Sequence, residues 1–297
     1  MRFELTEDQR DFAASLDKLL AAADTPNVAR SWADGDHEPG LALWSRLAQQ
    51  GVTDLADQET IVELCVAFEA LGRHAVPGPW VESAAVLPMA LGRDLSDTIA
   101  SLAAPPQVPY ALDADVASDV FVVQDGRLHA ATVGAPVHSV DRTRHLFTLV
   151  PGDPVDTVEL HDGLALGVLA TAAQLLGAGE RVLADSVTYV KQRRQFGREI
   201  GSYQAIKHAL ADVRIALDFA RPLVYGAALG EISNSAAKVA AADAAYLAAR
   251  TGLQVHGAIG YTAEFDLSIW ITKIRALVGA WGTPGFHRQQ LLEELTR

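Results

Sequence analysis

Two short segments in the last third of the chain contain the side chains best suited to chemistry. The first, residues 189–200, contains Arg193, and the second, residues 254–262, begins with Gln254 and continues to Gly257. A guanidinium group is always charged, and its fork of donors matches the oxygens of a pyrophosphate. A glycine lets the backbone come close to a ligand. These residue types therefore suit an anionic cofactor that carries phosphates.

Several other kinds of catalytic site are not indicated. The nine histidines form no His-x-x-x-His or His-Glu-x-x-His spacing, so we expect no metal site. The sequence has no Gly-x-Ser-x-Gly motif, no phosphate-binding loop and no Gly-x-Gly-x-x-Gly motif that would indicate another enzyme class. The single cysteine, Cys65, can form no intrachain disulfide and is expected to be a buried thiol.

The composition argues against polyanionic partners. The chain has 297 residues, with 24 Lys+Arg against 37 Asp+Glu, and a formal net charge of −13. Nucleic acids and anionic membrane surfaces are bound through basic patches, whereas the longest basic run here is the pair Arg193-Arg194. We therefore expect neither partner. With 49% hydrophobic and 21% charged residues, the chain has the composition of an ordered globular protein.

The sequence also bears on localisation. Residues 1–5 lack the apolar core of a signal peptide. The longest uncharged stretch, residues 163–179, is shorter than the ~20 apolar residues that span a bilayer, and it is predicted to be a buried helix. Together with the single cysteine, these features lead us to expect a cytoplasmic protein.

The elements that must position these residues are mostly helical. In the first hundred residues, Thr6–Gln9 has the spacing of a capping box, and helices are predicted over 41–50, 58–71 and, in shorter pieces, 81–104. In the last third, long helices are predicted over 164–191, 204–229 and 233–255. Long antiparallel helices with short connections predict a helix bundle.

The middle of the chain has a different pattern. From residue 108 to 160, short apolar runs rich in Val, Phe and Thr predict strands, and Asp125-Gly126 favours the tight turn of a hairpin over 121–129. Further strands are predicted over 146–150 and 157–160. The predicted fold is therefore mostly α with a small β segment. It comprises an N-terminal helical domain (1–104), a reduced β domain (105–162) and a C-terminal four-helix-bundle domain (163–297).

The two segments of the last third resemble the acyl-CoA dehydrogenase family. Residues 189–200, together with 203–207, are similar to its arginine-containing loop, and residues 254–262 are similar to its second hallmark, a Gln followed by a Gly-rich turn. Their order and separation also match. Residues 5–12 and 44–51 are similar to the family's N-terminal helices, and the tail 281–288 is similar to a short, divergent branch. The resemblance covers both helical ends and fails in the middle.

The resemblance implies an oxidoreductase that removes two vicinal hydrogens from an acyl-CoA thioester. It also implies FAD as the cofactor and an electron-transfer flavoprotein as a partner. In the family, the counterparts of Arg193 and Gln254 reach an FAD that is bound mainly by a neighbouring subunit. The cofactor-binding residues implied by the match are Arg193, Gln195, Phe196, Tyr203, Gln254, Gly257, Ala258 and Thr283.

The family's catalytic base has no counterpart here. In most members, a glutamate stands just before a Gly-Thr pair near the C-terminus, but Trp281 precedes Gly282-Thr283, and indole cannot accept a proton in this role. In a second branch, the base lies at the position of Gly167, and residues 163–179 contain no acid. We therefore expect no catalytic residue in this chain. The family's flavin-ring loop also has no match, since residues 105–109 occupy its approximate place.

Three hypotheses follow. The first is a short, base-less subunit of a heteromeric acyl-CoA dehydrogenase of the actinobacterial steroid-degrading type, with an α2β2 assembly. This subunit would complete the FAD site of a full-length partner that binds most of the acyl-CoA. The second is a self-sufficient homo-oligomeric dehydrogenase with a displaced base, for which Glu264 is a weak candidate. The third is a non-enzymatic scaffold that has lost flavin.

Overall fold

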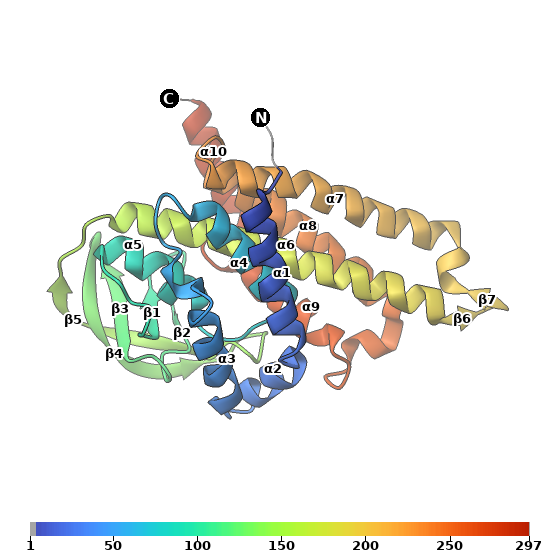
Figure 1. The fold of residues 1–297 in the computed structure, drawn as a ribbon, viewed down its shortest axis with the longest axis horizontal. Helices are drawn as coiled ribbons and strands as arrows, with labels where there is room; N and C mark the ends of the chain where they lie inside the picture. The colour runs from blue at the N-terminus through green and yellow to red at the C-terminus, as the bar shows by residue number, and fades with distance from the viewer. Residues whose placement is uncertain (1–3, 297) are drawn as a thin grey trace.

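A small sheet lies at one end of a long helical bundle in the computed structural model, which describes residues 4–296 (Figure 1). The expectation that the chain begins without a signal peptide rests partly on residues 1–3, which lie outside the described residues. The N-terminal helices are α1 (Glu7–Ala21), α2 (Thr25–Ala33), α3 (Glu38–Ala48), α4 (Ile61–Arg73) and α5 (Leu87–Leu91), with the short turns η1 (Val52–Asp54) and η2 (Glu82–Val86).

Helix α1 begins where the capping box predicts. The Thr6 hydroxyl accepts a hydrogen bond from the Gln9 backbone at 3.2 Å, and the Gln9 side chain accepts one from the Thr6 backbone at 2.9 Å. Helix α2 was not expected from the sequence. It has only nine residues and carries Pro26 in its first turn, so its buried side chains, Val28 and Trp32 among them, make too short a pattern to show a helical period.

The strands form one five-stranded sheet in the order β1-β3-β4-β5-β2, in which β1 and β3 are parallel and the other pairs are antiparallel. The strands are β1 (Ala100–Ala103), β2 (Ala111–Leu112), β3 (Asp119–Gln124), β4 (Arg127–Val137) and β5 (Leu146–Val155). Asp125 and Gly126 join β3 to β4 with φ angles of 50° and 74°, as the predicted turn requires.

Two sequence expectations for this region were wrong. Residues 100–103 form a strand instead of helix, because the run is buried on both faces and shows no alternation. Residues 157–160 form no strand, because the chain turns there into the next helix.

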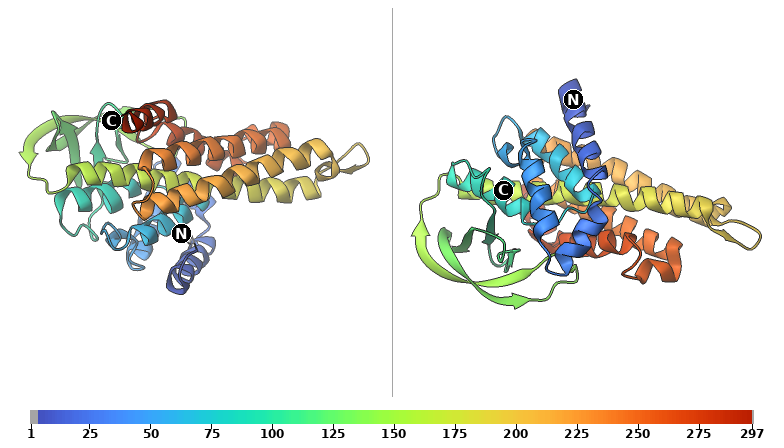
Figure 2. Two further views of the ribbon diagram at one scale, coloured as in Figure 1. Left: turned by 90° about the horizontal axis from the view of Figure 1, so that it is seen from above. Right: turned by 60° about the horizontal axis from the view of Figure 1, so that its bottom comes forward.

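The C-terminal bundle contains the longest helices. Its elements are α6 (Leu160–Gln192), the hairpin β6 (Arg194–Gln195) and β7 (Arg198–Glu199), η3 (Ile200–Ser202), α7 (Gln204–Ala228), α8 (Asn234–His256), η4 (Gly257–Tyr261), α9 (Leu267–Gly279) and α10 (Pro284–Leu295). Helix α6 runs from the sheet to the hairpin (Figure 2). It is long and apolar enough to span a bilayer, but 78% of its most apolar window is buried in the fold, as in a core helix. The predicted fold class is confirmed.

Helices α4 and α6 pack closely through glycine. A Cβ atom on Gly177 would lie 1.9 Å from the Glu69 carbonyl oxygen, and one on Gly72 would lie 2.0 Å from the Gln174 carbonyl oxygen. No side chain fits at either position without displacing backbone. The N-terminal helices are therefore held directly against the central helix of the bundle.

Candidate functional site

The Arg193 segment lies at the end of the bundle farthest from the sheet (Figure 1). Arg193 caps α6, and its side chain makes no hydrogen bond or ion pair with residues 4–296. Phe196 stands at the tip of the β6–β7 hairpin, with a φ of 53° and 91% of its surface exposed. The Tyr203 hydroxyl donates a hydrogen bond to the Gln195 carbonyl at 3.4 Å. The hairpin thus presents a guanidinium and an aromatic ring to its surroundings.

The Gln254 segment lies beside this hairpin. The ring of His256 stacks on that of Tyr189, four residues before Arg193, with their centroids 4.1 Å apart. Burial lowers the pKa of His256, and its Nδ1 pairs with the Gly252 carbonyl at 2.8 Å, so the neutral ring serves for packing. The structure therefore brings together the two segments that the sequence indicated separately.

The turn after α8 is open. Gln254 and Ala258 are exposed, and no heavy atom lies within 4 Å of the place where a Cβ of Gly257 would stand. Gly257 has a φ of 64°, which favours glycine. A ligand can approach the backbone of this turn closely. Glu264, the weak candidate for a displaced base, is exposed a few residues beyond.

Thr283 does not join the other seven residues. It caps α10, where its hydroxyl accepts a hydrogen bond from the Phe286 backbone at 3.2 Å. The neighbouring carbonyl of Gly282 accepts from Lys238, in the second turn of α8. Because Gln254 lies 16 residues farther along α8, the two places are about 24 Å apart along the helix.

The two positions of the family's base meet in space. A Cβ atom on Gly167 would lie 2.7 Å from Cζ3 of Trp281, so the indole packs on the glycine. Trp281 is only 4% exposed and has a φ of 56°. No acid occupies either position, and a larger residue at 167 would collide with the indole.

Two buried side chains hold Trp281 in place, and sequence reasoning missed one of them, Lys238. Nζ of Lys238 donates to the carbonyls of Leu277, Val278 and Gly282 at 3.1–3.2 Å. Nε2 of His287 lies 2.8 Å from the Trp281 carbonyl. Burial lowers the pKa of Lys238 to about 7 and also lowers that of His287. The only sequence signal for Lys238 is a charged residue among the alanines at the start of α8.

A buried carboxyl, Glu82, was also missed. It lies on η2, is 1% exposed, and lies near the Trp281 side chain. Burial raises its pKa, and its Oε2 has no partner among residues 4–296. Trp281 lines a hollow between the sheet, the start of α6 and α10, whereas Glu82 does not line it.

A hollow of about 400 Å³ lies between the sheet, the start of α6 and α10. Pro105 and Gln107 line it from the segment that takes the place of the flavin-ring loop, and Trp281 lines it from the base position.

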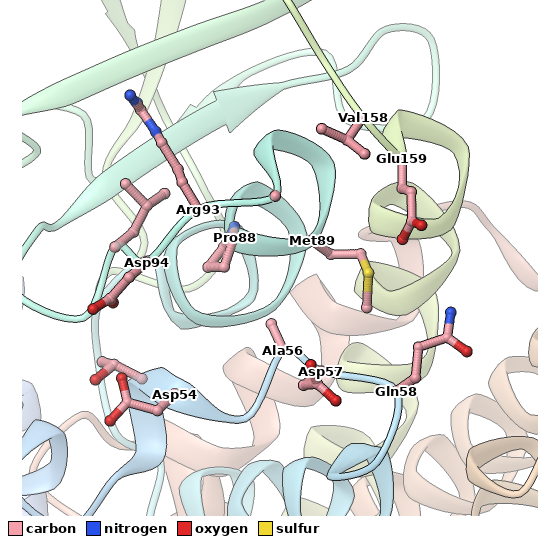
Figure 3. A pocket seen from close by; sticks show the side chains of 13 residues that line it. Asp54, Ala56, Asp57, Gln58, Pro88, Met89, Arg93, Asp94, Val158 and Glu159 are labelled. Atoms are coloured by element: carbon pink, nitrogen blue, oxygen red, sulfur yellow. The ribbon is translucent and has the colours of Figure 1, made fainter.

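A second hollow, of about 570 Å³, lies between η1, α5 and the start of α6 (Figure 3). Its charged lining comprises four acids and one arginine: Asp54, Asp57, Asp94, Glu159 and Arg93. This balance does not suit an anionic CoA ester.

Comparison with known proteins gives a consistent picture. Residues 160–296 match the model of the acyl-CoA dehydrogenase C-terminal domain. The chain is 28% identical over 289 residues to acyl-CoA dehydrogenase IpdE2 of Mycobacterium tuberculosis, covering 90% of this chain and 91% of that one.

Two solved structures share the whole fold. A chain of the ChsE4-ChsE5 complex from Mycobacterium tuberculosis matches with a TM-score of 0.82 and 21% identity, covering 100% of this chain and 99% of that one. A chain of the Tcur3481-Tcur3483 steroid ACAD matches with a TM-score of 0.83 and 19% identity, covering 98% of each chain. At these identities, the two likenesses establish the fold.

Proposed function

This chain belongs to the acyl-CoA dehydrogenase family, and we propose that it is the base-less subunit of a heteromeric, FAD-dependent acyl-CoA dehydrogenase. The observation that carries the proposal is the contact of Trp281 with Gly167, which leaves both family positions of the base without an acid. At the other end of the molecule, the residues that would serve a cofactor are exposed. The chain would therefore contribute to binding but not to proton abstraction.

The exposed end fits the phosphate-bearing part of FAD. Arg193 has no internal partner, so its donor fork is available to a pyrophosphate. The open turn at Gly257 admits a ligand to the backbone, and Gln254 adds an amide beside it. When bound, FAD would accept the hydride from the β carbon of the acyl group. These groups line neither of the two hollows described above, which supports a site that a second subunit completes.

An apolar surface along the bundle supports a protein partner. Ile215 and Phe219 lie one turn apart on α7 and are 53% and 72% exposed, and Tyr246 and Leu247 on α8 are partly exposed as well. Exposed apolar residues grouped on neighbouring helices are typical of subunit interfaces. We propose that a full-length acyl-CoA dehydrogenase subunit covers this surface in an α2β2 assembly. The likeness to a chain of the ChsE4-ChsE5 complex supports a heteromeric assembly.

The proposal also assigns roles to the partner subunit, an electron acceptor and the substrate. The partner would supply the glutamate and bind most of the acyl-CoA, and an electron-transfer flavoprotein would receive the electrons. The likeness to a steroid ACAD supports a steroid-derived acyl group. We place the complex in the cytoplasm.

Co-expression tests the proposal. The chain is produced with and without the acyl-CoA dehydrogenase homologue encoded beside it, and the flavin absorbance, oligomer mass and acyl-CoA oxidation are measured. We expect a yellow, active α2β2 complex and a colourless lone chain. A yellow, active homo-oligomer of the lone chain would support the self-sufficient enzyme instead.

Arg193→Ala tests the shared cofactor site within that complex. We expect FAD affinity to fall about 10- to 100-fold, since a charge-assisted hydrogen bond contributes about 1.5–3 kcal/mol. Arg46→Ala is the matched control, because Arg46 is exposed on α3, distant from the hairpin. A colourless complex that Arg193→Ala leaves unchanged would indicate the scaffold.

A further inference from the structure

Three metal-ligating side chains meet where the N-terminal helices adjoin the sheet. His37 precedes α3, Asp115 follows β2, and His145 precedes β5. His37 Nε2 lies 3.3 Å from His145 Nδ1. Asp115 Oδ2 lies 3.9 Å from the former nitrogen and 4.0 Å from the latter. All three ligand atoms lie within 4.8 Å of one another.

We propose that these three side chains bind one Zn²⁺ ion. At Zn–N distances of about 2.0–2.1 Å, a tetrahedral angle places two nitrogens about 3.3–3.4 Å apart, and the two imidazoles already have this separation. The Asp115 oxygen has to move toward the histidines by about 0.6 Å to reach the same geometry. Its side chain is 34% exposed, so rotation is little hindered by packing. A water molecule would take the fourth position.

A buried carboxylate fixes both histidines. Asp113 is fully buried, and its Oδ1 accepts hydrogen bonds from the His145 backbone at 3.1 Å and from Trp32 Nε1 at 3.2 Å. The Trp32 ring in turn packs against His37, with their centroids 4.5 Å apart. Asp113 thus positions one histidine directly and the other through the tryptophan. Such outer partners orient the ligands of metal sites.

Asp113 also places a buried carboxyl beside the cluster. Its Oδ2 is buried without a hydrogen-bond partner among the described residues, and its Oδ1 lies 3.7 Å from His145 Nδ1. An unpartnered carboxyl oxygen inside a protein is costly unless a positive charge lies near it. Arg144 and Lys273 already act on this carboxyl, and a divalent ion held by His145 would add to their charge.

An ion can reach the cluster from solvent. Asp115 and His145 line a hollow of about 430 Å³, which His138, Arg142 and Arg144 also line. Arg142 pairs with Asp34 at 2.8 Å, and the charge of Arg144 acts on Asp113. An anion is a poorer occupant than a cation. It would lie beside the Asp115 carboxylate, whose Oδ2 is 3.9 Å from His37 Nε2.

Sequence analysis did not predict this site. The expectation of no metal rested on local histidine spacing, whereas these ligands come from three loops, and His37 and His145 are 108 residues apart. A bound ion would tie the α2–α3 connection to the ends of two strands. Its role would therefore be structural.

Metal titration of the purified chain tests the proposal. The chain is stripped with a chelator and titrated with Co²⁺, whose visible absorption reports tetrahedral coordination, and Zn²⁺ is then added as a competitor. We expect one ion per chain. His145→Gln and Asp115→Asn should each weaken binding by about 100-fold or more, since changes in outer partners alone cost 10- to 100-fold. His138→Gln is the control, because it lines the same hollow outside the cluster, and it should bind as the wild type does.

The same variants distinguish a loss of ligand from a loss of fold. Asp115 is exposed, so Asp115→Asn should keep the wild-type circular dichroism and lose only the rise in Tm that Zn²⁺ produces. The proposal is overturned if Co²⁺ gives no tetrahedral spectrum, or if Asp115→Asn and His145→Gln bind as the wild type does. A rise in Tm with phosphate but not with Zn²⁺ would also overturn it and identify an anion site. None of these readouts depends on flavin or on acyl-CoA oxidation.

Discussion

Trp281 and Gly167 have complementary shapes, so neither can change alone. The indole fills the space beside the glycine, and the glycine leaves room for the indole. A carboxylate at 281 would have to replace a large buried ring, at a cost of about 3–5 kcal/mol for the lost packing. A glutamate at position 281 would therefore restore the family's residue type without restoring the catalytic site around it.

Trp281→Glu should give no acyl-CoA oxidation in the lone chain. The new acid lacks both an opposing flavin-ring loop and the packing that holds residue 281. The measurement is dye-coupled oxidation of acyl-CoA, with chemical denaturation to record the loss of stability. Trp281→Phe is the control for packing. Oxidation by the glutamate variant that exceeds that of this control would contradict the expectation.

His287 makes the region around Trp281 sensitive to pH. Burial lowers its pKa from 6.5, so the unfolded chain binds a proton at a higher pH than the folded chain does. This histidine should therefore destabilise the fold as the pH falls below 6.5, and the loss should continue down to its folded pKa.

Denaturation at a series of pH values measures this effect. His74 and His256, whose pKa values are also lowered, contribute in the same sense. His287→Gln should reduce the slope of unfolding free energy against pH below 6.5 without abolishing it. An unchanged slope would show that His287 is not buried in its neutral form.

Among the elements, α4, α6 and α7 are joined by charge as well as by close packing. Arg221 on α7 donates to Glu69 on α4 at 2.8 Å and to Glu180 on α6 at 2.9 Å. Arg214 adds two more hydrogen bonds to Glu180. Burial opposes the charge of Glu180, but the two arginines outweigh it and hold its pKa below the ordinary value. Three helices therefore share one network of charges.

Arg221→Met should lower the unfolding free energy by about 2 kcal/mol, because it leaves two partly buried carboxylates with fewer partners. Arg288→Ala is the comparison. Arg288 pairs with Asp243 where both side chains are more than half exposed, and such a pair contributes less than about 1 kcal/mol. Urea denaturation of both variants checks the difference. Equal losses would show that the network adds nothing beyond a surface ion pair.

The length of each helix or strand decides how well the sequence could predict it. The long helices of the bundle have apolar periods that persist over many turns, so their bounds were predicted to within a few residues. Helix α2 and strand β1 are too short to carry such a period. In the candidate site, the Arg193 and Gln254 segments were found through motifs. Lys238, Glu82 and the His37 cluster were missed, because only tertiary contacts give them their partners.

The whole molecule has different surfaces on its bundle and on its sheet. On the bundle, in the second half of α7, Phe219 is 72% exposed and makes little contribution to the fold of its own chain. Our proposal assigns this apolar surface to the partner subunit.

Phe219→Lys should therefore weaken co-assembly with the partner and leave the Tm of the lone chain nearly unchanged. Native mass measurement of the co-expressed pair checks the assembly. Val150→Lys, at a comparably exposed apolar position on the sheet, should leave the complex intact. If Phe219→Lys still assembles fully, α7 does not face the partner.

The length of α6 has a consequence for how such a subunit can change over evolution. Gly167 and Arg193 lie at opposite ends of this continuous helix, about 39 Å apart along its axis. Substitutions that remove an acid or shorten a loop near the first residue leave the position of the second unaltered. A gene copy with this architecture can lose its own reaction and still offer a neighbour an intact surface.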